Sequence, residues 1–179
     1  MATGLLVVDV QPQYDAFCGY IASQVARRIN NTVKPVSIMW VGDGLSNDSE
    51  ETVREYLRDY GARPQRLAEA TFIEKGYGFF RGWMDNGVDS DDIIKVGRNM
   101  LQRGLYSSDE VDLELLYAGN VPELPDFDLL HRPSFDDGRL RMMDRFETCG
   151  GGSEECLAEV ELWLRMVDKP FSRLDSMVY

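Results

Sequence analysis

The chain has little of what metal, nucleic-acid or membrane chemistry requires. Among its 179 residues there is one histidine, His131, which excludes metal sites built from two or three histidines and any histidine-based catalysis that does not use this residue. Basic residues number 19 against 31 acidic ones, so the net charge is −12 and the basic surface that binds nucleic acids or anionic lipids is missing. No apolar run approaches the roughly 18 residues of a membrane-spanning helix. We therefore expect no cofactor, no bound metal, and neither nucleic acid nor membrane as a partner.

Cysteine is also scarce. The 3 cysteines, an odd number in an acidic chain, predict reduced thiols and a cytoplasmic location. Residues 1–9 lack a basic leader and reach an acidic side chain early, so we expect no secretory signal. The length predicts one domain, spanning residues 1–179, with enough chain to bury a sizeable core.

Short apolar runs alternate with segments of helical periodicity over most of the chain. The apolar runs predict strands at 5–8, 36–41, 70–74, 145–149 and 171–178. Helical spacing of apolar residues predicts helices at about 21–31, 48–60, 90–103 and from 153 onward. This order predicts an α/β fold: a doubly wound, mostly parallel sheet of five or six strands with helices on both faces.

Polar residues indicate where three of these helices begin. Either Asp48 or Ser49 can cap the second helix, and Asp48 with Glu51 has the spacing of a capping box. Ser90 and Ser153 are the corresponding candidates for the two later helices.

Residues 105–144 depart from the alternation. Residues 111–117 could form a strand, and three prolines follow between 120 and 133. We interpret 105–144 as an irregular insertion in the domain, with a hairpin as one form that it could take.

Three reactive side chains follow predicted strands. Asp9 comes after the first strand, Lys75 after the third, and Cys156 after the Gly150–Gly152 turn that ends a later strand. Ligands of open parallel sheets bind beyond these strand ends. A thiol in the first turn of a helix meets unpaired N–H groups that favour the thiolate, and the glycines let backbone N–H groups approach a substrate oxygen. Asp9 is the candidate base, and Lys75 can stabilise the thiolate and an anionic intermediate.

These three motifs, in this order, resemble the isochorismatase-like cysteine hydrolases. Residues 5–11 (LLVVDVQ) are similar to the first-strand signature of that family, and residues 75–80 (KGYGFF) to the segment around its lysine. Residues 150–157 (GGGSEECL) are similar to its glycine-led turn, which ends in the nucleophilic cysteine. The family has a doubly wound sheet and an Asp-Lys-Cys triad that cleaves amides, or an enol ether in isochorismatase itself.

The resemblance implies a role for each matched residue. Asp9 is implied as proton acceptor, Lys75 as electrostatic partner and Cys156 as nucleophile. The backbone N–H groups of Gly152 and Cys156 are implied as the oxyanion hole, with a cis peptide near Gly151-Gly152.

The matched segments also contain candidate substrate-binding residues. Gln11 lies in the first motif, and Phe79 and Trp83 are apolar enough to line a pocket or to pack on a partner subunit. Family members commonly self-associate, so the resemblance implies a homo-oligomer that acts on a small-molecule substrate. Nicotinamidases of this family bind a metal near the end of the second strand, where residues 40–44 offer Asp43 but no histidine, so we do not expect that activity.

Three functions remain open at this point. The leading hypothesis is a cysteine-dependent hydrolase of a small amide or related carbonyl compound, acting through a thioester. The alternative is a catalytically inactive isochorismatase-like protein that acts through protein–protein contacts, which the 105–144 segment and the negative charge favour. A thiol sensor that uses Cys149 and Cys156 is the third. The glycine turn also suggests a phosphate loop, but Glu154 and Glu155 would place two carboxylates beside the anion.

Overall fold

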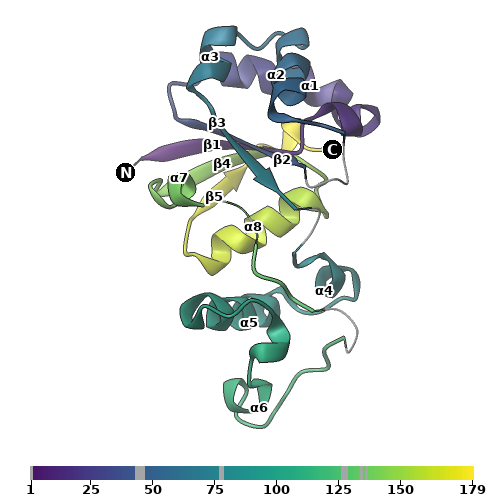
Figure 1. Cartoon of the computed structure of the whole chain (residues 1–179), viewed down its shortest axis with the longest axis vertical. Helices are drawn as coiled ribbons and strands as arrows, with labels where there is room; N and C mark the ends of the chain where they lie inside the picture. The colour runs from purple at the N-terminus through teal and green to yellow at the C-terminus, as the bar shows by residue number, and fades with distance from the viewer. Residues whose placement is uncertain (1, 43–46, 77–78, 126–128, 134, 136) are drawn as a thin grey trace.

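The protein has an α/β fold built on a five-stranded, all-parallel sheet flanked by helices (Figure 1). The computed structural model describes residues 2–42, 47–76, 79–125, 129–133, 135 and 137–179. The strand order is β3-β2-β1-β4-β5. The strands are β1 (Thr3–Val8), β2 (Val36–Val41), β3 (Thr71–Lys75), β4 (Arg145–Gly150) and β5 (Phe171–Arg173). Because the chain starts in the middle of the sheet, builds outward to β3 and then returns to the other side of β1, the predicted doubly wound arrangement is confirmed.

Helices cover both faces of this sheet. The longer helices are α1 (Asp15–Asn31), α2 (Glu50–Asp59), α5 (Ser90–Arg103) and α8 (Cys156–Met166). The shorter helices are α3 (Pro64–Glu69), α4 (Arg81–Asp85), α6 (Leu113–Leu116) and α7 (Gly138–Arg141), with 3-10 turns η1 (Pro12–Tyr14), η2 (Ser108–Glu110) and η3 (Asp175–Met177). Figure 1 shows α1, α2 and α3 on one face, and α8 with α5 beyond it on the other. None of the described helices is long and apolar enough to cross a bilayer.

Successive residues of β1 pack alternately into two separate hydrophobic cores, one on each face of the sheet. Leu5 and Val7 pack with α1 and α2, whereas Leu6 and Val8 pack with α5 and α8, and all four are fully buried. A strand with helices on both faces must be apolar at every position, which is why the run at 5–8 contains no polar residue. The strands predicted at 36–41, 70–74 and 145–149 are confirmed within one residue at either end.

Two strand predictions are wrong. Residues 113–116 form the short helix α6 because the Asp112 side chain accepts a hydrogen bond from the Leu115 N–H and caps it. The last strand is only Phe171–Arg173, since the chain then turns through η3. Within 105–144, Ser107 and His131 form an isolated antiparallel bridge, and α6 lies beyond α5, far from the sheet (Figure 1).

The helices begin at residues other than some of those predicted. The capping box of α2 joins Ser49 to Thr52 and leaves Asp48 outside it. The N-cap of α5 is Asp89, one residue before Ser90. The first residue of α8 is Cys156 and its N-cap position is Glu155, so the predicted cap at Ser153 is wrong. The Ser153 N–H instead donates to the carbonyl oxygen of Tyr179, and this bond holds 153–155 in a turn before the helix.

Candidate active site

Asp9, Lys75 and Cys156 converge at the carboxyl edge of the sheet. Asp9 follows β1, Lys75 ends β3, and Cys156 begins α8 after β4. Lys75 Nζ lies 3.0 Å from Asp9 Oδ2, and both side chains have no exposed surface. Both charges act on the Cys156 thiol, whose residue is partly buried. Apart from their contacts with each other and with the Cys156 thiol, the Asp9 oxygens and Lys75 Nζ have no hydrogen-bond partner among the described residues, so this ion pair keeps bonding capacity for a reacting molecule.

Asp9 occupies a backbone conformation that is unusual for a residue with a side chain. Its φ is +51°, in the left-handed region. The Asp9 N–H still donates to the Met39 carbonyl of β2 at 2.9 Å, so the turn away from the sheet takes place within this one residue. Such a conformation costs on the order of 1 kcal/mol and is found preferentially at functional sites.

Lys75 is held as an ammonium. Burial lowers its pKa, but the negative charge of Asp9, together with Cys156 and Glu159, outweighs this effect and raises the pKa above its usual value. The buried Asp9 carboxylate therefore has a permanent counter-ion, without which its charge would be very costly.

Cys156 is held as a thiol. Burial, followed by the negative charge of Asp9, raises its pKa to about 12, and the opposing effect of Lys75 is smaller. The expected stabilisation of the thiolate at the start of the helix is therefore wrong, because burial and the charges of Asp9 and Glu159 favour the thiol. A nucleophilic Cys156 thus requires a proton acceptor at the moment of attack, and Asp9 is in place for that role.

The glycine turn brings the nucleophile back over the sheet. Gly150 and Gly151 have φ of +78° and +58°. A Cβ on Gly150 would lie 2.3 Å from the Val8 carbonyl oxygen, and one on Gly151 would lie 2.9 Å from the Leu157 nitrogen. No peptide bond in the described part of the chain is cis, so the cis peptide expected near Gly151-Gly152 is wrong. Left-handed glycines, which need no isomerised bond, make this turn.

Two backbone donors next to the thiol remain open. The N–H groups of Gly152 and Cys156 bind no acceptor in the described part of the chain. Both residues line the pocket described below. They are thus available to bind an oxyanion, as the sequence motif implies.

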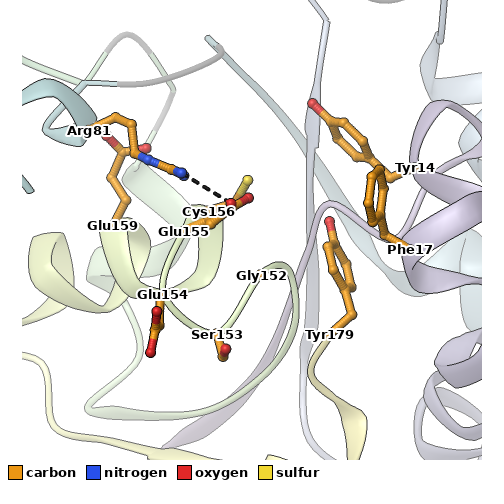
Figure 2. A pocket seen from close by; sticks show the side chains of 10 residues that line it. All are labelled: Tyr14, Phe17, Arg81, Gly152, Ser153, Glu154, Glu155, Cys156, Glu159 and Tyr179. Atoms are coloured by element: carbon orange, nitrogen blue, oxygen red, sulfur yellow. Dashed lines mark ion pairs between the residues drawn. The ribbon is translucent and has the colours of Figure 1, made fainter. Parts of the chain in front are cut away.

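Cys156 opens into a pocket of about 440 Å³, which is large enough for a small molecule. Figure 2 shows an aromatic wall of Tyr14, Phe17 and Tyr179 facing Cys156 and Glu155. The rings of Phe17 and Tyr179 are stacked at 6.3 Å with an interplanar angle of 24°. The remaining lining residues are Arg81, Gly152, Ser153, Glu154 and Glu159.

Arg81 places a guanidinium group in the pocket, where it binds the carboxylates of Glu155 and Asp85. Its Nη2 lies 3.2 Å from Glu155 Oε1, an ion pair drawn as a dashed line in Figure 2. Its Nε donates to both carboxylate oxygens of Asp85 at 2.8 and 2.9 Å. This ion-pair chain fixes the side of the pocket opposite the aromatic wall.

The three predicted substrate-binding residues do not line this pocket. The buried Gln11 amide donates to the Val41 carbonyl at 3.1 Å and accepts from the Val41 N–H at 2.8 Å, which ties the loop after β1 to the end of β2. Phe79 and Trp83 are buried in the core on the α8 face. A structural role accounts for the contacts of all three side chains.

Five pocket residues were not singled out from the sequence: Tyr14, Phe17, Arg81, Glu159 and Tyr179. Arg81 directly follows the lysine motif, and Tyr14 and Phe17 follow the aspartate motif by only a few residues. Their closeness in sequence to these motifs could have identified them as candidate pocket residues. Tyr179 and Glu159 carried no such signal.

The structure also tests the predicted roles of Cys149 and Asp43. Cys149 is fully buried in the core on the α1 face, whereas Cys156 packs against the core on the α8 face, an arrangement that does not favour a disulfide between them. Burial raises the pKa of Cys149 to about 12. Asp43 lies outside the described residues, and the described chain contains no cluster of His, Cys, Asp and Glu able to hold a metal ion.

Comparison of the chain with family models, curated proteins and solved structures finds no match. The resemblance to isochorismatase-like hydrolases therefore depends on the three sequence motifs alone.

Proposed function

We propose that this chain is a cysteine-dependent hydrolase of a small amide or related carbonyl compound, of the isochorismatase-like type. The observation that carries the proposal is the buried Lys75–Asp9 ion pair, 3.0 Å long, beside a thiol that opens into a pocket. A purely structural ion pair has no need of a neighbouring thiol or of two open N–H donors.

In the first half of the proposed reaction, Cys156 Sγ attacks the carbonyl carbon while its proton passes to Asp9. The N–H groups of Gly152 and Cys156 bind the resulting oxyanion. When Asp9 takes up the proton it becomes neutral, and the positive charge of Lys75 then stabilises the negative charge that develops on the intermediate. As the intermediate collapses, the C–N bond breaks, the leaving amine takes the proton from Asp9, and an acyl thioester on Cys156 remains.

In the second half, water attacks the thioester and gives its proton to Asp9. The C–S bond then breaks, the carboxylic acid leaves, and Cys156 recovers its proton from Asp9. One water is consumed, and one acid and one amine are released.

The pocket indicates the shape of the substrate. A flat apolar group next to the carbonyl would pack on the wall of Tyr14, Phe17 and Tyr179. The substrate class within this proposal is accordingly a small amide with a ring or another planar group.

A cytoplasmic homo-oligomer is part of the same proposal. Phe17 and Tyr20 lie on the same side of α1, three residues apart, and are 61% and 68% exposed. Phe17 lines the pocket, and exposed apolar residues such as these two are suited to contact with a second copy of the chain. Sedimentation velocity measures this, and a purely monomeric protein at micromolar concentration would contradict it.

Aldehydes test the proposed nucleophile without knowledge of the substrate. The thiol of Cys156 adds across the carbonyl of benzaldehyde, with its proton passing to the oxygen, and the adduct imitates the tetrahedral intermediate. We expect benzaldehyde to raise the melting temperature of the wild-type protein, and to have no effect on Cys156→Ala. Cys149→Ala is the matched control because its thiol is fully buried elsewhere. An equal response of wild type and Cys156→Ala would refute the proposal.

The second candidate function, an inactive protein that acts through protein contacts, has its own supporting observation. Residues 105–144 contain five of the large apolar side chains that are exposed in the described structure: Tyr106, Leu115, Val121, Leu129 and Met142. If Cys156→Ala leaves the biological activity intact, this candidate replaces the hydrolase.

A further inference from the structure

The pocket contains a buried carboxylate that the proposed reaction does not use. Glu159 lies three residues after Cys156 on α8, and only 2% of its surface is exposed. It lines the pocket together with Cys156 and Arg81 (Figure 2). Carboxylates are rarely so buried without a specific partner, so the contacts of Glu159 are informative.

The partners of Glu159 are backbone N–H groups on the segment that follows Lys75. Its Oε1 accepts from the Phe79 N–H at 2.6 Å and also from the Phe80 N–H. The backbone of Arg81 acts on it in the same way. Burial raises the pKa of the Glu159 carboxyl group above its usual value, and these donors, together with the charge of Lys75, oppose that effect. The same hydrogen bonds attach the start of α4 to α8. The segment carrying the lysine and the helix carrying the nucleophile are thereby joined at one side chain.

Glu159 also changes the balance of charge around the thiol. The titratable groups that act on Cys156 are Asp9, Lys75, Glu159 and the phenol of Tyr179. Glu154, Glu155 and Arg81 also line the pocket, and Glu155 and Arg81 form an ion pair with each other. Asp9 and Glu159 contribute two negative charges and Lys75 one positive charge. A thiolate would add a further negative charge to a set that already has an excess of one, and this opposes loss of the thiol proton.

We propose that Glu159 is a positioning residue that holds the segment after Lys75 against α8 and keeps Cys156 in the thiol form before proton transfer to Asp9. The inference concerns the regulation of the same site and rests on the proposed function of Cys156. A thiol kept protonated is protected from oxidation and from unselective alkylation, because the thiolate is the reactive form.

Alkylation of Cys156 without any substrate tests the electrostatic part. Glu159→Gln keeps an oxygen acceptor for the Phe79 and Phe80 N–H groups and removes the charge. We expect iodoacetamide to modify Cys156 at least about twofold faster in Glu159→Gln than in wild type between pH 8 and 10, as quantified by peptide mass spectrometry. Glu161→Gln is the matched control: this buried glutamate lies on the same helix but binds Arg173 and Thr148, away from the pocket. Its alkylation profile should equal that of wild type.

The outcome that would overturn the inference is equal modification of Cys156 in wild type and Glu159→Gln, including the case in which neither reacts. Hydrogen exchange of the Phe79 and Phe80 amides tests the positioning part: exchange should accelerate at least tenfold in Glu159→Ala and much less in Glu159→Gln. Unchanged exchange in Glu159→Ala would show that the carboxylate does not hold this segment. Failure of either test leaves the benzaldehyde result unaffected, so the two proposals can fail separately.

Discussion

Lys75 and Asp9 form a fully buried ion pair, 3.0 Å long, across two strands that are not neighbours in the sheet. β2 lies between β1 and β3, so the pair bridges the carboxyl end of β2. Removing one partner leaves an isolated charge in a site without exposed surface, and this is among the most destabilising changes available to a protein.

Separation of this ion pair should therefore be costly. Lys75→Met is expected to lower the free energy of unfolding by about 3–5 kcal/mol, because the Asp9 carboxylate stays buried without a counter-ion. Asp9→Asn combined with Lys75→Met should recover a large part of that loss. Urea unfolding followed by circular dichroism measures both.

The control for this experiment is an ion pair at the surface. Arg98 Nη2 and the Asp168 carboxylate form such a pair, in which the Asp168 side chain is 82% exposed. Asp168→Asn should change stability by no more than about 0.5 kcal/mol. If Lys75→Met is as mild as Asp168→Asn, the Lys75–Asp9 pair is not the buried unit described above.

Stability should decline at high pH because of Cys156. Its pKa rises from the ordinary 9.0 to about 12 on folding, so between these values the folded protein binds a proton that the unfolded chain has lost. Stability contributed by the protonated thiol is complete below pH 9 and is lost as the pH rises toward 12. The expected loss is at most about 1.4 kcal/mol per pH unit.

Comparison with Cys156→Ala isolates this effect. The variant retains Cys149, whose pKa burial also raises to about 12, together with every lysine and tyrosine. Its stability should therefore fall less steeply between pH 9 and pH 11 than that of wild type, by urea unfolding. Parallel pH profiles of the two proteins would contradict the raised pKa of Cys156.

The central strands could be predicted from the sequence because burial on both faces leaves a continuous apolar signature, as at 5–8. The convergence of Asp9 and Lys75 followed from the same reasoning, since carboxyl ends of parallel strands meet at one edge. Local pattern failed at 113–116, where a single hydrogen bond from Leu115 to Asp112 decides between helix and strand.

The rest of the pocket depends on contacts between distant segments. Tyr179 reaches the site because its N–H donates to the Gly151 carbonyl and its own carbonyl accepts from the Ser153 N–H, and no local pattern encodes such pairing. A glutamate in a helix is usually predicted to face solvent, but the segment after Lys75 covers Glu159 in the folded protein. Cys156 was expected to be acidic from its place on a helix, and the burial that reverses this expectation is a tertiary property.

The left-handed conformation of Gly150 should be essential to the site. Gly150→Ala introduces a Cβ that would lie 2.3 Å from the Val8 carbonyl oxygen, in addition to the cost of a φ of +78°. The expected loss is more than about 2 kcal/mol of stability. Gly87→Ala is the matched control, because its φ is +74° and a Cβ there meets nothing within 4 Å. It should lose only about 1 kcal/mol. Equal losses by thermal unfolding would mean that the close approach of Gly150 to β1 is not a constraint.

The aromatic wall should determine binding more than chemistry. Tyr179→Ala removes the ring that stacks on Phe17 and covers the pocket, so the affinity for benzaldehyde, or for a flat amide substrate, is expected to fall about tenfold, or about 1.4 kcal/mol. Tyr179→Phe keeps the ring and should bind almost as well as wild type, since the hydroxyl makes only a long 3.4 Å contact with the Asp9 carbonyl. Tyr106→Ala, an exposed residue of the insertion, is the control for nonspecific loss of aromatic surface. Isothermal titration with the three variants separates these effects: unchanged affinity in Tyr179→Ala would remove the aromatic wall from the binding site, because a ring that contributes nothing to affinity cannot be contacting the ligand.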